Sequence, residues 1–208
     1  MTSDLSSYQY YIFDLDNTLY PEIQYLQAAW KEIGQWLNTW KPEYSPNTVE
    51  NWLSHEFHKQ GRTKLFDRFI QQFELENEDL EYLLDILRTV QVSGGISLFP
   101  EIESWIKSEP IKNKSIFIIT NGNPLQQKNK FDQLNRRNIS IEEFLMANTI
   151  IPKPDPAAFI HLLHKHHLNS KQGLSIGDSE EDRLASEAAG IEFITIEAFK
   201  ILISQSEL

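Results

Sequence analysis

The sequence of 208 residues contains no cysteine. This absence excludes disulfide bonds, metal sites built from thiolates, and a cysteine nucleophile. Long apolar runs are missing too, because uninterrupted aliphatic or aromatic stretches reach only about four residues, whereas a membrane-spanning helix needs about 20. We therefore expect a protein that does not span a membrane.

Basic residues are outnumbered by acidic ones, 19 Lys and Arg against 30 Asp and Glu, which gives a formal net charge of −11. Proteins that bind nucleic acids or anionic membranes gather phosphates on a basic face, so this balance argues against both partners. The polar N-terminus, residues 1–9, lacks the apolar core of a signal peptide. Together with the lack of cysteine, which is compatible with a reducing compartment, this favours a cytoplasmic protein.

Glycine is also scarce, with only eight residues, so its positions carry information. Gly122 and Gly177 each follow an apolar segment, as expected where a strand ends in a tight turn. Four apolar segments predict buried strands, and a weaker fifth lies near Phe144–Ala147. The four segments are Tyr10–Phe13, Ile116–Ile119, Leu174–Ile176 and Phe193–Ile196.

Helical patterns separate the later strands, at Pro124–Asn135, Pro156–His167 and Asp182–Ala189. Strand–helix alternation predicts a doubly wound α/β fold, in which a parallel, Rossmann-like sheet lies between two layers of helices. Residues 22–97 differ, because their apolar residues recur with helical spacing and no strand is evident. We therefore predict an all-helical insertion at residues 22–97 and an α/β domain formed by residues 1–21 and 98–208.

The sharpest chemical signal is Phe13-Asp14-Leu15-Asp16-Asn17-Thr18, where a predicted strand runs directly into two carboxylates. Residues two apart on an extended chain share a face, so Asp14 and Asp16 can both project from the carboxyl end of this strand. Ligands of open α/β sheets bind at that end. Two carboxylates this close favour a bound Mg²⁺, or else a raised pKa in one of them. For this segment alone, an ordinary turn rich in Asp and Asn is the alternative.

Two later segments offer groups that suit a phosphate. Thr120-Asn121-Gly122 follows the strand at Ile116–Ile119 with a hydroxyl, an amide and a glycine, which suit an oxyanion cradle, although Asn-Gly is also a common turn. Lys153 stands between two prolines, which stiffen the loop and suit a fixed positive charge for a dianion. The alternative is that Lys153 is merely a solvated lysine at the start of a helix.

A second acidic segment follows the strand at Leu174–Ile176. Gly177 and Asp178 end this strand, and Asp182 comes one helical turn later. The spacing places Asp178 beside a prospective metal and Asp182 as a further ligand or as a partner of the ligands. The alternative is an acidic helix start, which the helix dipole favours in any case.

Together these residues resemble the four motifs of the haloacid dehalogenase-like (HAD) hydrolase superfamily, in the same order along the chain. The motifs are Asp14-x-Asp16-x-Thr18, Thr120 after an apolar strand, Lys153, and Gly177-Asp178-x-x-x-Asp182. The resemblance covers residues 9–21 and 98–198. Within the superfamily the chain is most similar to small-molecule phosphatases with a helical cap, which include phosphoglycolate phosphatases and pyrimidine 5′-nucleotidases.

The resemblance implies a role for each of these residues in phosphoryl transfer. Asp14 would be the nucleophile that forms an aspartyl-phosphate, and Asp16 would be the general acid and base. The oxygens of the transferring phosphoryl group would be held by Thr120, the backbone amide of Asn121 and Lys153.

The resemblance also implies Mg²⁺ as the cofactor. Its ligands would be Asp14, the backbone carbonyl of Asp16 and Asp178, with Asp182 orienting the set. Many relatives carry Asn-Asp at this point of the last motif, whereas Arg183 follows Asp182 here. Whether Asp182 is a direct metal ligand or a partner of the ligands therefore stays open.

The predicted activity is hydrolysis of the phosphate monoester of a small metabolite, with residues 22–97 as a cap on a catalytic core of residues 1–21 and 98–208. Asp16 argues against dehalogenation, because a leaving halide needs no proton. Two alternatives stay open. A phosphomutase of the β-phosphoglucomutase type uses the same pair of aspartates, and a binding protein can retain the fold without turnover. The sequence predicts neither the physiological substrate nor the oligomeric state.

Four other groups of residues are expected to be structural. Four of the five tryptophans lie in the helical insertion, where packing in its core is favoured over stacking on a nucleotide base. Arg62, Lys64 and Arg68 are expected to be solvated rather than bound to a second anionic group of the substrate. Four histidines within residues 161–167 indicate a positive helix end rather than a metal site. Lys128 and Lys130 are expected on a helix surface.

Overall fold

A parallel five-stranded sheet lies at the centre of the first of two compact units in the computed structural model, which describes residues 5–205. The first four residues of the polar N-terminus lie outside the described residues. The strand order is β3-β2-β1-β4-β5, so the first strand in sequence occupies the middle, and the predicted doubly wound α/β class is confirmed. The strands are β1 (Tyr10–Phe13), β2 (Ser115–Thr120), β3 (Glu143–Met146), β4 (Gly173–Gly177) and β5 (Glu192–Thr195).

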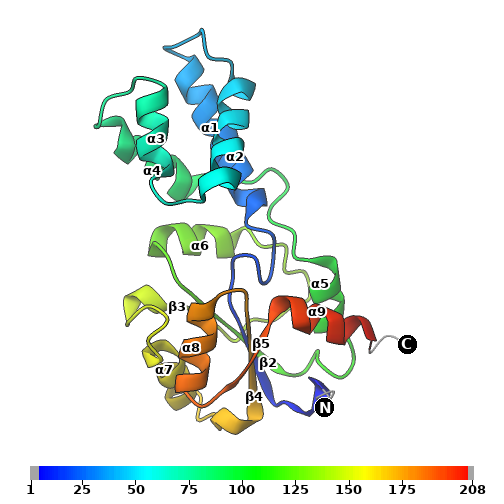
Figure 1. The fold of residues 1–208 in the computed structure, drawn as a ribbon. Coiled ribbons are helices and arrows are strands. Elements are labelled where there is room, and N and C mark those ends of the chain that lie inside the picture. Colours follow the sequence, from blue (N-terminus) through cyan, green and yellow to red (C-terminus); the bar gives the residue numbers. More distant parts are fainter. Residues whose placement is uncertain (1–4, 206–208) are drawn as a thin grey trace. The chain divides into compact units, whose positions relative to one another are not determined.

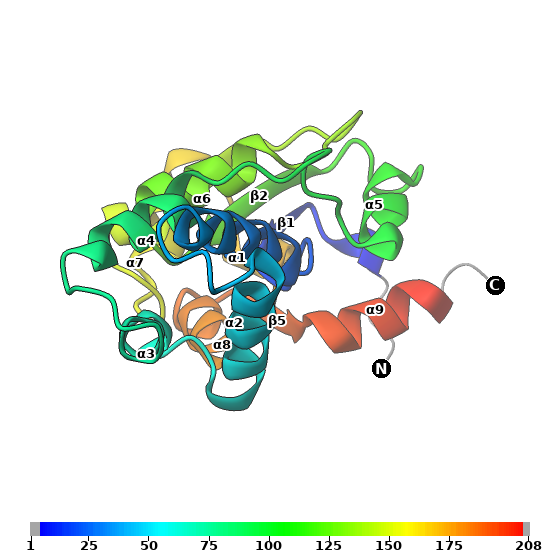
Figure 2. The ribbon, with the colours of Figure 1, turned by 90° about the horizontal axis from the view of Figure 1, so that it is seen from above.

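The two faces of β1 pack against different helices, as the alternation of side chains along a strand requires. Tyr10 and Ile12 belong to a buried cluster that includes residues of α7 (Ala157–Lys165) and α8 (Glu180–Ala188). Tyr11 and Phe13 face the other way and make edge-to-face ring contacts with Trp105 of α5 (Pro100–Lys107) and Phe199 of α9 (Ile196–Gln205). Figures 1 and 2 show α5 and α9 together on one side of the strands, with α7 and α8 on the other.

Two helices of this unit, α5 and α9, were not predicted. Helix α5 is short and begins at Pro100, whose fixed φ suits the first turn of a helix. Helix α9 follows β5 without a loop, so that Ile196, predicted as the end of a strand, is the first helical residue. An apolar run that changes from strand to helix contains no turn signal, and this is why the sequence pattern did not separate the two elements.

Residues 22–96, together with residues 128–133, form the second compact unit. Its helices are α1 (Ile23–Asn38), α2 (Pro46–Gln60), α3 (Leu65–Gln72), α4 (Asp79–Thr89) and the last part of α6 (Pro124–Asp132), whose first residues belong to the sheet unit. Short 3-10 turns complete the chain as η1 (Leu5–Ser7), η2 (Ala147–Thr149) and η3 (Ser170–Gln172). Within residues 5–205, no helix is both long and apolar enough to cross a membrane.

Gly34 sets the close approach of α1 and α2. A Cβ atom at position 34 would lie 2.7 Å from the carbonyl oxygen of Pro46, which real Cβ atoms do not tolerate. Helix propensity alone would favour Gly34→Ala by about 0.5–1 kcal/mol. We expect the clash to dominate, so that Gly34→Ala lowers the free energy of unfolding by about 1–3 kcal/mol.

Urea unfolding of Gly34→Ala measures this effect. Gln35→Ala is the control, because Gln35 is the next residue of α1 and is exposed. An alanine variant at position 34 as stable as the wild type would contradict the packing argument.

Two expectations about the helical unit need correction. Trp30 is buried as predicted, but Trp40 is 47% exposed and makes an edge-to-face contact with Trp36 instead of packing in a core. Lys130, expected on a helix surface, is 1% exposed. Its Nζ atom lies 3.1 Å from Oε1 of Glu22, and a buried lysine requires such a countercharge.

Candidate active site

The polar groups predicted to act together lie at the carboxyl ends of the three central strands. Phe13 pairs with Ile118 of β2 on one side and with Ile176 of β4 on the other. The backbone N–H of Asp14 extends this pairing, because it donates to the carbonyl of Ile176 at 2.9 Å. Residues that follow β1, β2 and β4 are therefore brought to one edge of the sheet, as expected for an open parallel sheet.

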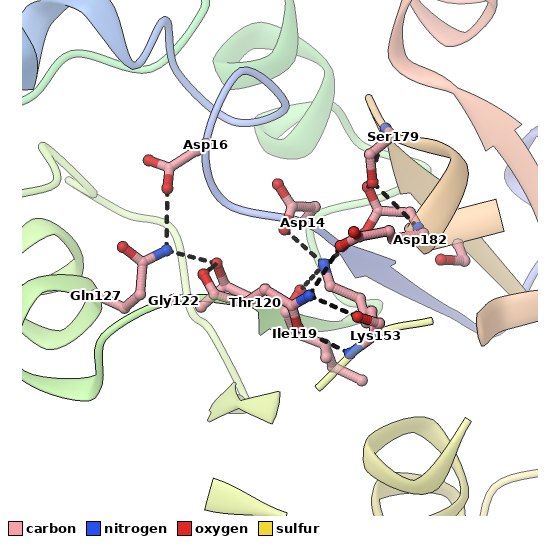
Figure 3. A network of polar contacts seen from close by, with 12 residues as sticks. Asp14, Asp16, Ile119, Thr120, Gly122, Gln127, Lys153, Ser179 and Asp182 are labelled. Carbon is pink, nitrogen blue, oxygen red and sulfur yellow. Dashed lines mark hydrogen bonds and ion pairs between the residues drawn. The ribbon is translucent and has the colours of Figure 1, made fainter. Parts of the chain in front are cut away.

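Lys153 is the cation at the centre of this edge. Its buried Nζ atom donates to Oδ1 of Asp14 at 2.7 Å, to Oδ1 of Asp182, and to the carbonyl of Ile119 at 3.1 Å (Figure 3). The solvated position considered for this lysine is thus excluded. One ammonium group satisfies two carboxylates and a strand-end carbonyl, which uses all three of its protons.

Asp14, Asp178 and Asp182 form an acidic trio around this lysine. Each offers a carboxylate oxygen, and the three oxygens lie within 4.8 Å of one another. Lys153 bonds to Asp14 and Asp182, and its single positive charge faces three carboxylates in all, so the trio has an excess of negative charge. Hard oxygen ligands in this number fit Mg²⁺, which binds carboxylates and keeps several waters.

The same shortage of positive charge alters the acidity of the trio. Burial, with further contributions from the charges of Asp182 and Asp16, raises the pKa of Asp14 to about 7 in spite of Lys153. Burial and the charge of Asp182 raise the pKa of Asp178 to about 6. Burial alone would lower the pKa of Lys153, but the charges of Asp14 and Asp182 raise it above its ordinary value. A cation bound here would relieve this repulsion.

Asp182 is held by the start of its own helix. Its Oδ2 atom accepts from the backbone N–H of Ser179 at 3.1 Å, and its own backbone N–H donates to Oγ of Ser179 at 3.2 Å, which forms the capping box of α8. The Ser179 hydroxyl also donates to Oδ2 at 2.6 Å. Gly177 makes room for this arrangement, because a Cβ atom there would lie 2.6 Å from the Asp182 side chain. Ser179 was not singled out in the sequence, although a serine three residues before an acid is the signature of a capping box.

Asp16 has different partners from Asp14, although only one residue separates them. Its Oδ1 atom accepts a hydrogen bond from the Tyr20 hydroxyl, and its Oδ2 atom accepts from Nε2 of Gln127 at 3.0 Å. Gln127 also donates to the hydroxyl oxygen of Thr120 at 2.7 Å, which links two predicted site residues. Sequence reasoning missed both Tyr20 and Gln127.

The side chain of Asn121 holds the loop that carries Lys153. Its Oδ1 accepts from the backbone N–H of Lys153 at 2.9 Å, and its Nδ2 donates to the Lys153 carbonyl at 2.9 Å. Nδ2 also donates to the Glu181 carboxylate at 3.1 Å. The sequence predicted a contribution from the backbone amide of Asn121, whereas this contribution of its side chain to the position of Lys153 was missed.

The other clusters singled out in the sequence have separate partners. Arg62 is exposed and pairs with Glu22 at 2.6 Å. Arg68, which was expected to be solvated, is instead largely buried in an ion pair with Glu56 at 2.8 Å. The ring of His166 lies 2.6 Å from the carboxylate of Glu143. Within residues 5–205, no histidine belongs to a group of three or more potential metal ligands. These contacts favour structural roles for the clusters.

Comparison with known proteins identifies relatives over almost the whole chain. Phosphoglycolate phosphatase from Psychrobacter arcticus is 25% identical over 190 residues, which cover 88% of this chain and 81% of the relative. Phosphoglycolate phosphatase from Aliivibrio fischeri is also 25% identical, over 193 residues that cover 86% of this chain and 79% of the relative.

Solved structures share the fold. A HAD-superfamily hydrolase of subfamily IA from Geobacter sulfurreducens PCA superposes with a TM-score of 0.60 at 18% identity, covering 94% of this chain and 90% of the other. A hydrolase from Streptococcus pneumoniae TIGR4 gives 0.58 at 19% identity, covering 95% and 99%. The model of one family, described as haloacid dehalogenase-like hydrolase, matches residues 11–196, which include the acidic trio and the whole sheet except Tyr10. The chain therefore belongs to the haloacid dehalogenase-like hydrolase family.

Proposed function

We propose that this protein is a Mg²⁺-dependent phosphatase that hydrolyses the phosphate monoester of a small metabolite. The observation that carries the proposal is the separation of two acids at the end of the central strand. Asp14 bonds to Lys153 and belongs to the acidic trio, whereas Asp16 bonds to Tyr20 and Gln127. Two carboxylates with separate partners suit two separate roles, a nucleophile and a group that transfers protons.

In the first half of the reaction, an oxygen of Asp14 attacks phosphorus and the bond from phosphorus to the ester oxygen breaks. Asp16, protonated, gives its proton to the leaving oxygen, so that a neutral alcohol departs. Asp14 then carries the phosphoryl group as an acyl phosphate. Lys153 would neutralise charge on the phosphoryl oxygens, and Thr120 and the backbone N–H of Asn121 would donate to them.

In the second half, water attacks the phosphorus of the aspartyl-phosphate. Asp16, now a carboxylate, takes a proton from this water, and the bond from phosphorus to the Asp14 oxygen breaks. Inorganic phosphate leaves, Asp14 is again a carboxylate, and Asp16 is again protonated, so atoms and charges balance over the cycle.

The acidic trio would hold the metal. We propose Asp14, Asp178 and the backbone carbonyl of Asp16 as ligands, with Asp182 orienting the set through its bonds to Ser179 and Lys153. When bound, Mg²⁺ would neutralise the charge that develops on the transferring phosphoryl group.

We also propose that residues 1–21 and 98–208 act as the catalytic core and that residues 22–97 act as a cap. The helical composition of the insertion and its own buried core support an independent role for it. Two relatives at 25% identity are named phosphoglycolate phosphatase, which makes 2-phosphoglycolate the first substrate to test.

Phosphate release from 2-phosphoglycolate, sugar phosphates, nucleoside monophosphates and p-nitrophenyl phosphate tests the function directly. We expect release that stops with EDTA and returns with excess Mg²⁺, because the trio holds the metal through exchangeable oxygen ligands. Release that continues in EDTA would contradict the metal requirement. Isomerisation of a sugar phosphate that exceeds phosphate release would identify a phosphomutase instead, and a folded protein inert on the whole panel would indicate a binding protein.

A further inference from the structure

Gln127 lies between two residues of the proposed reaction without belonging to any of the four motifs. It sits in α6, a helix that begins four residues after β2 ends, and its side chain is 2% exposed. Its Nε2 atom donates to Oδ2 of Asp16 at 3.0 Å and to Oγ1 of Thr120 at 2.7 Å (Figure 3). One buried amide thus bonds both the proposed proton donor and a proposed phosphate ligand.

The chemistry of an amide nitrogen fixes the direction of both bonds. The NH₂ group has two protons to donate and accepts no hydrogen bond, so both of its contacts must be donations. Thr120 therefore uses an oxygen lone pair towards Gln127 and keeps its own proton for another acceptor. That proton faces the carbonyl of Asn121 at 3.3 Å, a long and weak bond that a phosphoryl oxygen could replace.

The same direction applies at Asp16. Its Oδ2 atom accepts from Gln127, and its Oδ1 atom accepts from the hydroxyl of Tyr20. These two donors, one on each oxygen, fix the orientation of the Asp16 carboxylate group.

The surroundings hold Gln127 in this position. Gly122 has a φ of +131° and leaves space for the side chain, because a Cβ atom there would lie 3.1 Å from Cδ of Gln127. Thr120 is buried with it, at the end of β2. A buried amide with few alternative positions imposes its geometry on its partners, and this rigid support is what a catalytic group requires.

We infer that Gln127 is a positioning residue that aligns Asp16 for proton transfer and Thr120 for phosphate binding through its two N–H groups. The inference rests on the proposed phosphatase function. Gln127 would not touch the substrate, and its effect would depend on how much the departing group needs a proton. A poor leaving group needs full protonation by Asp16, whereas a good one departs with little help.

Two aryl phosphates of similar shape distinguish a leaving group that needs a proton from one that does not. p-Nitrophenol is a good leaving group and phenol a poorer one, so we would measure kcat/KM of wild type, Gln127→Met and Gln127→Glu on p-nitrophenyl phosphate and phenyl phosphate. Methionine keeps the length of the side chain without an N–H group, and glutamate places an acceptor against Asp16. We expect the preference for p-nitrophenyl phosphate, as the ratio of the two kcat/KM values, to rise about tenfold or more in both variants.

Gln126→Met is the matched control, because it makes the same substitution one residue earlier in α6, and its ratio should equal that of the wild type. The ratio compares two substrates on one preparation, so a partly unfolded variant does not change it. A ratio within about twofold of wild type in both variants, with wild-type turnover intact, would overturn this inference alone. Wild-type protein that hydrolyses none of the phosphate esters of the full panel would overturn the proposed function, and this inference with it.

Discussion

Replacement of Asp14 by asparagine is expected to lower phosphate release by a factor of about 10³ or more while the protein stays folded. The amide nitrogen of asparagine cannot attack phosphorus, so no acyl phosphate forms on the side chain. The fold should tolerate the change, because asparagine keeps an oxygen that can accept the hydrogen bond from Lys153. Burial also raises the pKa of Asp14 to about 7, so a neutral side chain relieves an unfavourable charge.

Phosphate release and thermal unfolding of the same preparation, measured in parallel, check this expectation. Asp67→Asn is the matched control, because Asp67 is exposed on α3 and should change neither quantity. Turnover of Asp14→Asn at the wild-type rate would refute the assignment of the nucleophile. An unfolded Asp14→Asn protein would contradict the argument about charge at this position.

The second large effect is expected on stability, from Lys153→Met. This substitution removes the buried cation but keeps a long side chain, and it leaves Asp14 and Asp182 facing each other without their shared countercharge. Loss of one partner from a buried ion pair costs about 3–5 kcal/mol, which is a large part of the stability of a typical domain. We expect the free energy of unfolding of the metal-free protein to fall by that amount, and phosphate release to be lost.

Urea unfolding in EDTA measures the change in stability. Lys128→Met serves as the control, since Lys128 makes an exposed ion pair with Asp132 and such pairs contribute at most about 1 kcal/mol. A Lys153→Met protein as stable as the Lys128→Met protein would contradict the view that Lys153 is the main countercharge of the trio. Added Mg²⁺ should recover part of the lost stability if the trio still binds it, because a bound cation replaces the missing charge.

The elements that carry the site could be predicted because each ends with a clear signal. A short apolar run followed by an acid, a hydroxyl or a glycine marks the end of a buried strand, and parallel strands bring such ends to one edge. This reasoning located Asp14, Thr120 and Asp178 by their neighbours in sequence. It did not place Lys153 near them, because only the family resemblance connected that loop to the sheet.

The helix that follows β2 shows why other residues were missed. Buried positions of α6 and the segment after it include Gln127, Lys130 and Leu134, which have the spacing of a helix face. Sequence patterns find such a face when its residues are apolar, and here two of the three are polar. Gln127 and Lys130 are buried because distant partners, Asp16 and Glu22, satisfy them, and one sequence alone does not reveal those contacts.

Tyr20 was missed for a related reason. Aromatic residues after a strand usually fill the core, and Tyr20 is indeed fully buried. Its hydroxyl nevertheless reaches the carboxylate of Asp16, a contact that depends on how the turn at residues 14–20 closes. A buried tyrosine can pack its ring in the core and also donate its hydroxyl to a nearby acid, and only the structure shows the second contact.

In the loop around residue 153, the position of the backbone and the charge of the side chain depend on two different residues. At residue 153, Asn121 bonds to the backbone N–H and the backbone carbonyl, so these two bonds do not depend on which side chain stands there. Asn121 thus determines where the loop lies, and residue 153 determines which charge the loop brings to the site. A different side chain at position 153 would occupy the same place, so the charge of the site can be redesigned by substitution at this position.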